Sequence, residues 1–319
     1  MAGAITGYGL LQALSQDSAA IQGGLSVATQ QAATGKVSPT YAGLGAAARV
    51  SLDLRPQIAH QQAWAANIDS ATARLGVTQS ALSAIGTIAA NFYAKLPGLN
   101  GLTPGAADGV ASQARGALEQ VAQLLNSKAG DAYVFAGQDS ANPPVPDTTA
   151  ATLVPALLSA TPGTAPFSAT LGTEVPTVEA GEGQRQPVGV LANANTLAVS
   201  APPTTGSYMR DVLRSLAALT TAQDGPGLQP LVADTRSRLE SAIAASSQEA
   251  GALGTVQAGL AARKTGLGEV QAALTAQVSG VEDVDLAATA VRVQALQTGL
   301  QASYQLIAGA KGLNLAQYL

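Results

Sequence analysis

Residues 283–319 show the hydrophobic pattern of one long helix. Leu286, Val293, Leu300 and Ile307 recur every seven residues, and Thr289, Leu296, Ser303 and Ala310 occupy the intermediate positions, which is the seam of a coiled coil. After Asp285 the only charged residues are Arg292 and Lys311. Because a solvated surface helix normally carries a charged face opposite its apolar stripe, we expect other helices to cover this one on several sides.

A matching seam lies at the other end of the chain, between Gly9 and Ala33. It consists of Leu11, Leu14, Ser18, Ile21, Leu25, Ala28 and Ala32, and Asp17 is the only charge before Lys36. Two lone helices bury too little to offset the entropy of ordering them. We therefore expect the two terminal helices to pair with each other and with neighbouring copies, and to be loose in a monomer.

These two seams define the candidate assembly interface. Heptad seams occur in any helical bundle, so what favours assembly is their position at both chain ends with so few charges. The candidate interface residues are Leu11, Leu14, Ile21, Leu25, Val293, Leu296, Leu300, Ile307, Leu313 and Leu315.

Further helical patterns follow inward from both ends. One runs from about Ala46 to Lys95 and contains Pro56, which either kinks the helix or marks where its continuous part begins. A third helix is predicted from about Val110 until Ala129-Gly130. The pattern resumes at Tyr208, pauses at residues 224–227 and continues to Val278. Short loops between these helices indicate antiparallel neighbours.

The middle of the chain has a different character. Residues 139–206 are rich in Pro, Thr, Gly and Val and have no helical period, which favours a small β-rich or irregular insert. The predicted fold class is therefore mainly α, with long antiparallel helices forming a coiled-coil rod from both chain ends and a small β-rich insert. The predicted domains are 1–45 with 280–319 for assembly, 46–138 with 207–279 as helical core, and 139–206 as outer insert.

The final helix has a candidate start signal. Ser279 and Glu282 have the S-x-x-E spacing of a capping box, and Asp283 and Asp285 lie near the positive end of the expected helix. The same three carboxylates could bind calcium, but no EF-hand spacing accompanies them, so helix capping is the preferred interpretation.

Composition excludes several classes of protein. Charged residues make up 11% and aromatic residues 3% of the chain, the net charge is −4, and no basic patch is present, so nucleic acid is not an expected partner. The absence of cysteine removes disulfides and thiolate sites. We see no cleavable secretory signal and expect no membrane span, because glutamines interrupt the best apolar run. If the protein is exported, it would use a route that does not depend on a cleaved signal peptide.

Candidate chemistry is sparse. His60 is the only histidine and has no ligand partner one turn away, so we expect a packed or surface residue rather than a metal site. Gly43-Leu44-Gly45 opens a G-x-G-x-x-A pattern, but no strand precedes it. In the insert, Glu174, Glu179, Glu182 and Arg185 are interpreted as solvated loop charges. We expect no catalytic, cofactor-binding or metal-binding residues and no enzymatic activity.

Several motifs resemble the bacterial flagellin family, and most closely its hook–filament junction proteins. The strongest similarity is in residues 282–287, 296–304 and 313–319; weaker similarity lies in Gln31–Lys36, residues 66–68, Arg74-Leu75 and residues 130–137. The resemblance covers roughly residues 1–138 and 208–319. Unlike many filament flagellins, the chain has Val37-Ser38-Pro39-Thr40 after Lys36 and lacks paired aspartates there, which favours the junction protein.

The resemblance implies a structural subunit of the flagellum, located outside the cell and exported unfolded through the flagellar type III channel. Its implied partners are copies of itself, the hook-side junction protein, flagellin and an export chaperone, with no cofactor. Two alternatives stay open: a flagellin that forms the filament itself, and a secreted helical effector or translocator. A secreted effector or translocator that inserts into membranes would need basic helix faces and aromatic anchors, which the terminal helices lack.

Overall fold

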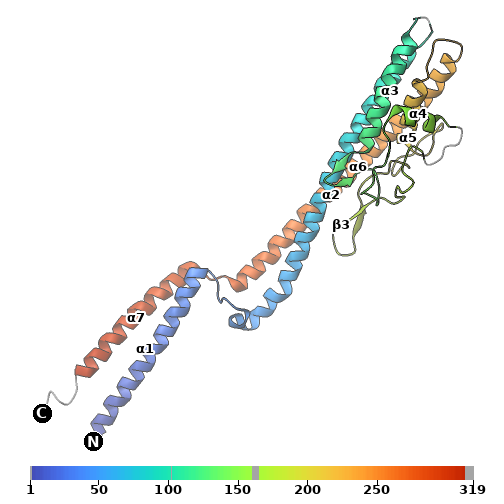
Figure 1. The fold of residues 1–319 in the computed structure, drawn as a ribbon. Helices are drawn as coiled ribbons and strands as arrows, with labels where there is room; N and C mark the ends of the chain where they lie inside the picture. The colour runs from blue at the N-terminus through green and yellow to red at the C-terminus, as the bar shows by residue number, and fades with distance from the viewer. Residues whose placement is uncertain (1, 102, 160–164, 313–319) are drawn as a thin grey trace. The chain divides into compact units, whose positions relative to one another are not determined.

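The computed structural model describes residues 2–101, 103–159 and 165–312 and is dominated by helices (Figure 1). The α-helices are α1 (Ala2–Thr34), α2 (Ala48–Lys95), α3 (Ala106–Leu125), α4 (Ala150–Leu158), α5 (Tyr208–Leu219), α6 (Leu228–Glu282) and α7 (Leu286–Gly312). Two short 3₁₀ helices, η1 (Tyr41–Ala47) and η2 (Leu96–Gly98), flank α2. Strand β1 (Lys128–Ala129) pairs antiparallel with β2 (Ala132–Tyr133), and β3 (Thr177–Glu179) pairs antiparallel with β4 (Arg185–Pro187). The predicted mainly α fold is confirmed.

Helix α2 begins at Ala48 and runs through Pro56, so of the two alternatives for this proline, a helix that starts near it is wrong. One predicted helix end also differs from the structure. Helix α3 ends at Leu125, short of the predicted stop at Ala129-Gly130, because residues 128–133 form the β1–β2 hairpin. Gly130 lies between these strands with φ of 62°, a left-handed conformation that glycine adopts without strain.

The chain divides into two compact units, and each is described separately. Unit 1 comprises residues 1–60 and 269–319, and unit 2 comprises residues 61–268, so both boundaries fall inside the long helices α2 and α6. The expected three-domain division placed these boundaries at residues 45 and 280 and set residues 139–206 apart. In the structure the insert packs with the helical core in unit 2.

Unit 2 has one continuous hydrophobic core. Leu75, Leu82 and Ile85 of α2, Leu118 and Val121 of α3, Leu213 and Leu216 of α5, and Leu239, Leu253 and Leu260 of α6 are all buried in it. The insert adds Leu153 and Val190 to the same cluster, and Phe135, which lies just before the insert, also belongs to it. Apolar residues three, four and seven positions apart lie on one face of each helix, which is why the sequence pattern predicts these helices. Most of the described buried apolar residues of the chain therefore lie in unit 2.

The insert contains less regular structure than its composition suggests. Its strands are the three-residue pair β3 and β4, and it also holds α4, a helix that the sequence pattern did not predict. Leu153 and Leu157 of α4 are buried against the core. The β3–β4 hairpin is attached to the long helices by Arg263, whose Nε donates to the carbonyl of Ala180 at 2.8 Å. Packing against existing helices, rather than local propensity, thus orders the insert.

A buried carboxylate attaches the end of the insert to α6. Glu249 is 0% exposed, and its carboxylate accepts the backbone N–H groups of Leu197 and Ala198 at distances down to 2.8 Å. Burial raises the pKa of Glu249, while the N–H donors lower it. The adjacent helix residue Gln248 accepts the N–H of Val199 at 3.3 Å. This loop is therefore fixed to α6 through its backbone.

We expect Glu249→Ala to release this loop, because the buried N–H of Ala198 and the partly buried N–H of Leu197 would lose their acceptor. An unsatisfied buried donor costs about 1–3 kcal/mol. Hydrogen exchange should speed up at Leu197 and Ala198 and stay unchanged at Leu118 in α3. The matched variant Glu249→Gln keeps one acceptor oxygen and should retain part of the protection. Equal protection in Glu249→Ala and the parent protein would contradict this role.

Candidate functional site: the helical pair at the chain ends

Helices α1 and α7 lie side by side and antiparallel in unit 1 (Figure 1). The Oγ atoms of Ser18 and Ser303 are hydrogen-bonded across the pair, and Gln22 Nε2 donates to the hydroxyl of Tyr304 at 2.5 Å. Near the middle of the pair, a Cβ added at Gly24 would lie 3.7 Å from the side chain of Leu296. The two terminal seams thus face each other within one chain.

The candidate interface residues are only partly covered by this pairing. Leu14, Ile21, Leu25, Val293, Leu296, Leu300 and Ile307 are all half-buried. The side chain of Leu11, and residues Leu313 and Leu315, lie outside the described part of the structure. The described seam residues therefore keep apolar surface that a second layer of helices could bury. Their role in assembly stays a prediction.

Unit 1 has almost no hydrophobic core in its described part. Its buried apolar residues there are Ala28 and Val278. Its buried polar residues are more numerous and comprise Ser18, Ser51, Glu282, Thr289 and Ser303. Hydrogen bonds and ion pairs, which contribute little net stability each, hold the helices in place. By itself this unit should be only marginally stable.

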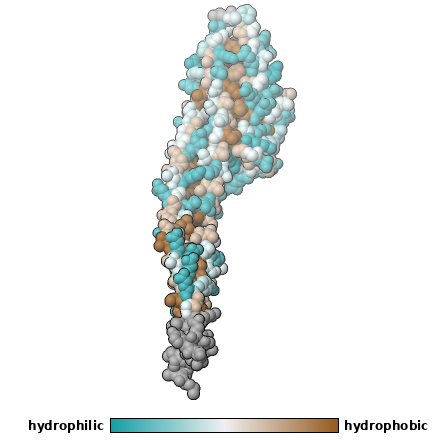
Figure 2. All heavy atoms as spheres, turned by 90° about the vertical axis from the view of Figure 1, so that its left-hand side faces the viewer, coloured by the Kyte–Doolittle hydropathy of each residue, from teal (hydrophilic) through white to brown (hydrophobic). Residues whose placement is uncertain are grey.

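Exposed apolar side chains are concentrated in the same unit. Of the eleven large hydrophobic residues exposed in the described part of the chain, nine belong to unit 1: Val27, Tyr41, Val50, Leu52, Val270, Leu286, Val291, Tyr304 and Leu306. Figure 2 shows hydrophobic surface as brown patches between hydrophilic ones. Unit 1 therefore carries most of the large apolar side chains that are exposed in the described part of the chain.

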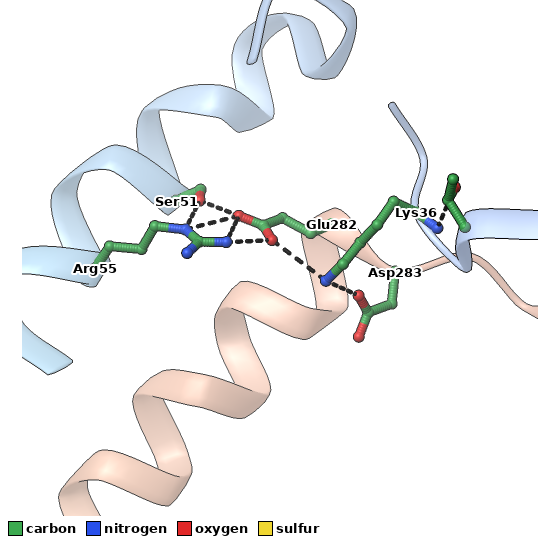
Figure 3. Close-up of polar contacts among 6 residues, drawn as sticks. Lys36, Ser51, Arg55, Glu282 and Asp283 are labelled. Carbon is green, nitrogen blue, oxygen red and sulfur yellow. Dashed lines mark hydrogen bonds and ion pairs between the residues drawn. The ribbon is translucent and has the colours of Figure 1, made fainter. Parts of the chain in front are cut away.

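A polar cluster around Glu282 joins three segments of unit 1 (Figure 3). The guanidinium of Arg55 in α2 donates to both carboxylate oxygens of Glu282, with Nη2 at 2.8 and 2.7 Å. Ser51 donates its hydroxyl to the same carboxylate. Lys36, which follows α1, places its Nζ 3.4 Å from Glu282 and 2.5 Å from Asp283. The last turn of α6 is thus tied to the start of α2 and to the end of α1.

The electrostatics of the cluster favour its ionised form. The hydrogen bonds from Arg55 and then Ser51 lower the pKa of Glu282 to about 2, and the hydrogen bond from Lys36 lowers the pKa of Asp283. The same contact with Asp283 raises the pKa of Lys36. Backbone bonds reinforce the link, since the N–H of Val37 donates to the Glu282 carbonyl at 2.7 Å and that of Val284 donates to Gly35 at 2.9 Å.

The predicted capping box at the start of the final helix is wrong. Ser279 and Glu282 lie in the last turn of α6, and α7 begins at Leu286 after three intervening residues. Asp285 caps α7 instead, because its Oδ1 accepts the N–H groups of Ala287 at 2.8 Å and Ala288 at 3.1 Å. The carboxylate of Glu282 accepts hydrogen bonds from the charged guanidinium of Arg55. It therefore does not accept the backbone N–H groups at the start of a helix, as a capping residue would.

Sequence reasoning missed Lys36, Ser51 and Arg55. Arg55 and Glu282 are 227 positions apart, so no local pattern relates them. The only local signal was a pair of cations in regions otherwise poor in charge. In the described part of the chain there is no group of three or more His, Asp or Glu residues placed to hold a metal ion. No described helix is long and apolar enough to cross a membrane.

Glu282→Gln should loosen the connection between these three segments, because it removes the charge that Arg55 and Lys36 contact. The cost is about 1 kcal/mol, since both cations are half exposed to solvent. Hydrogen exchange at Val37 and Val284 should therefore speed up by roughly fivefold. Asp53→Asn is a matched control, because Asp53 is exposed and pairs only with Arg49 at 3.8 Å. Unchanged exchange in Glu282→Gln would contradict the assignment.

The same contacts predict a pH dependence. The folded-state pKa of Glu282, about 2, lies below its ordinary value of 4.5. Its contribution to stability is therefore fully present above pH 4.5 and is lost as the pH falls toward 2. Exchange at Val37 and Val284, corrected for the intrinsic effect of pH, should increase across this window in the parent protein. Glu282→Gln should show a smaller increase, because of the carboxylates of Glu282 and Asp283 only that of Asp283, whose pKa is also lowered, is left to titrate.

The described structure is mainly helical, and its N- and C-terminal helices α1 and α7 pair with each other. Residues 237–319 match the family model of the bacterial flagellin C-terminal helical region. No curated protein sequence matches the chain significantly. The described helices α6 and α7 make up most of the matched segment. The predicted resemblance to flagellin-like proteins is thus confirmed for the C-terminal sequence.

Solved structures extend the similarity to the fold. A Vibrio parahaemolyticus protein assigned as a flagellar hook-associated protein is 12% identical, with a TM-score of 0.58 over 74% of this chain and 97% of that one. Two crystal structures of Xanthomonas campestris FlgL also match. The one in space group H3 is 13% identical and covers 70% of this chain and 99% of its own, with a TM-score of 0.42. The one in space group C2 is 12% identical and covers 78% and 98%, with a TM-score of 0.38. The chain shares the fold of the Vibrio protein.

Proposed function

We propose that this protein is a structural subunit of the bacterial flagellum that connects hook to filament. The observation that carries the proposal is the contrast between its units: unit 1 exposes nine large apolar side chains and buries only Ala28 and Val278 among its described apolar residues. Such a unit gains its stability when neighbouring copies cover it. The flagellin-type sequence of residues 237–319 supports a flagellar assembly in particular.

The contact surface consists of the seams of α1 and α7. Leu14, Ile21 and Leu25 on one helix and Val293, Leu296, Leu300 and Ile307 on the other are half-buried against each other. Neighbouring subunits would bury what remains exposed, and Leu11, Leu313 and Leu315 would extend the interface toward the chain ends. The partners are copies of this chain, a hook-side junction protein and flagellin, with an export chaperone before assembly. The role is structural and involves no reaction.

The location that goes with this role is outside the cell. An exported subunit must pass a narrow channel unfolded, and a chain without cysteine cannot be trapped by disulfides on the way. Marginal stability of unit 1 also suits a segment that folds only when it is assembled. Export would then need no cleaved signal.

Immunogold electron microscopy of flagellated cells tests the proposal, with antibody raised against the insert, residues 139–205. We expect label in one short zone between hook and filament. Label along the whole filament would instead make the protein a flagellin, the second candidate. Absence of label from the flagella of cells that produce the protein would refute both.

A further inference from the structure

Two buried serines meet in the seam between α1 and α7. Ser18 is 6% exposed and Ser303 is 7% exposed, and their Oγ atoms are hydrogen-bonded to each other across the pair. Ser18 Oγ also donates to the carbonyl of Leu14 in its own helix, at 2.8 Å. Because a hydroxyl has one proton to donate, Ser303 is the donor in the bond between the helices. Ser18 therefore supplies the acceptor that Ser303 uses on the other helix.

The neighbouring contacts agree with one antiparallel register. A Cβ added at Gly24 would lie 3.7 Å from the side chain of Leu296, and one added at Gly299 would lie 4.0 Å from that of Ile21. One heptad along each helix from the serine pair, Leu25 accordingly comes opposite Leu296. The serine pair is thus one layer in a seam whose next layers are apolar.

A heptad seam alone does not fix this register. If α7 slid along α1 by seven residues, seam residues would still face seam residues, because the pattern repeats every heptad. A slip in one direction would place Ser303 opposite Leu25, and a slip in the other would place Ser18 opposite Leu296. Either slip separates the two hydroxyls and leaves a buried polar group against a leucine. The serine pair therefore distinguishes the observed register from its nearest alternatives.

Other polar groups of the helical pair discriminate less between registers. Thr289 is buried in the α7 seam, but its hydroxyl donates to the carbonyl of Asp285 in the same helix at 2.7 Å, a bond that does not depend on α1. Gln22 Nε2 donates to the hydroxyl of Tyr304 across the pair at 2.5 Å. Both of those side chains are exposed, so water can replace their bond at little cost.

We propose that the hydrogen bond between Ser18 and Ser303 selects the register of α1 against α7 rather than adding to the stability of the pair. A buried polar pair in an apolar seam specifies alignment at a cost in stability, because the hydroxyls give up water for one mutual hydrogen bond. The register decides which parts of the two seams stay uncovered for other molecules. Because both helices belong to one chain, this selection operates whether or not the protein is a flagellar subunit.

Distances between spin labels on the two helices test the register. The full-length chain has no cysteine, so Ala13→Cys and Ala290→Cys, both at exposed positions, would carry the labels. A slip of one heptad moves α7 by about 10 Å along the axis, and the labels lie at different levels, so each direction changes their distance differently. Pulsed electron paramagnetic resonance should give one narrow distance distribution for this labelled protein.

Replacing both serines in the labelled protein, Ser18→Ala with Ser303→Ala, should add populations displaced by roughly 10 Å. Circular dichroism should show no loss of helix, because removing both partners of a hydrogen bond leaves no buried hydroxyl unsatisfied. Ser15→Ala with Thr298→Ala is the matched control. Those hydroxyls lie on the same helices but are exposed and donate to carbonyls of their own helix, so the distribution should stay narrow.

Three results would overturn the proposal. A distribution that stays single and narrow without the two serines would mean that apolar packing alone sets the register. Loss of helix together with a broad distribution would mean that the serines stabilise the pair rather than align it. A broad distribution in the labelled protein that keeps both serines would mean that they select no register in the chain.

Discussion

Leu300→Asp is expected to leave the protein soluble and exported but absent from assembled flagella. Leu300 is half-buried in the seam between α1 and α7. A carboxylate there loses the burial of a leucine, about 1.5–3 kcal/mol, and adds the cost of desolvating a charge. Every copy carries the same substitution, so this free-energy cost opposes the addition of each subunit. Cells that carry only this variant should release it into the medium and lose motility.

Gln301→Asp is the matched control for that result. It introduces the same charge one residue further along α7, where the side chain is exposed. It should assemble much better than Leu300→Asp, as judged by the protein recovered with sheared flagella. Normal flagella in the Leu300→Asp strain would contradict the role of the seam. Equal loss in both strains would mean that charge on α7, rather than its position in the seam, prevents assembly.

Leu82→Ala is expected to destabilise unit 2 by about 2–5 kcal/mol, the range for a fully buried leucine whose removal leaves a cavity. Leu82 is 1% exposed and lies in the core among α2, α3, α5 and α6. Urea denaturation followed by circular dichroism should show a lower midpoint with an unchanged slope. The size of the effect reflects close packing, since neighbouring side chains move only partly into the space.

A second leucine of the same helix provides the comparison. Leu52 also lies in α2 but belongs to unit 1 and is 52% exposed. Leu52→Ala should therefore change stability by about 0.5 kcal/mol or less. A similar loss in both variants would contradict the division between a packed unit 2 and an uncovered unit 1. A small loss in Leu82→Ala would mean that the core can close around the missing side chain.

The long helices were predictable because their signal is local. The apolar residues of α1, α2, α3, α5, α6 and α7 recur at helical spacing, so each helix could be inferred without knowing its neighbours. The ends of the helices were harder to predict. Helix α3 ends early because the residues after it form the β1–β2 hairpin instead of continuing the helix. Helix α4 escaped detection because it is short, contains Pro155, and is held by packing of Leu153 and Leu157.

The polar cluster could not be read from local spacing. Ser279 and Glu282 have the spacing of a capping box. That spacing does not indicate whether the Glu282 carboxylate accepts a hydrogen bond from a backbone N–H group or from Arg55. Only the fold brings Lys36, Ser51 and Arg55 to one carboxylate. Asp285 then takes the capping role, since it is the acceptor that remains at the start of α7.

By itself, the sequence determined that the terminal segments are helical and poor in charge, since helical period and composition are properties of neighbouring residues. The tertiary structure decided what those ends touch. It paired α1 with α7, left their apolar residues half-covered, and placed the insert on the core of unit 2. Contacts between residues hundreds of positions apart depend on how the whole chain folds, and no local pattern encodes them.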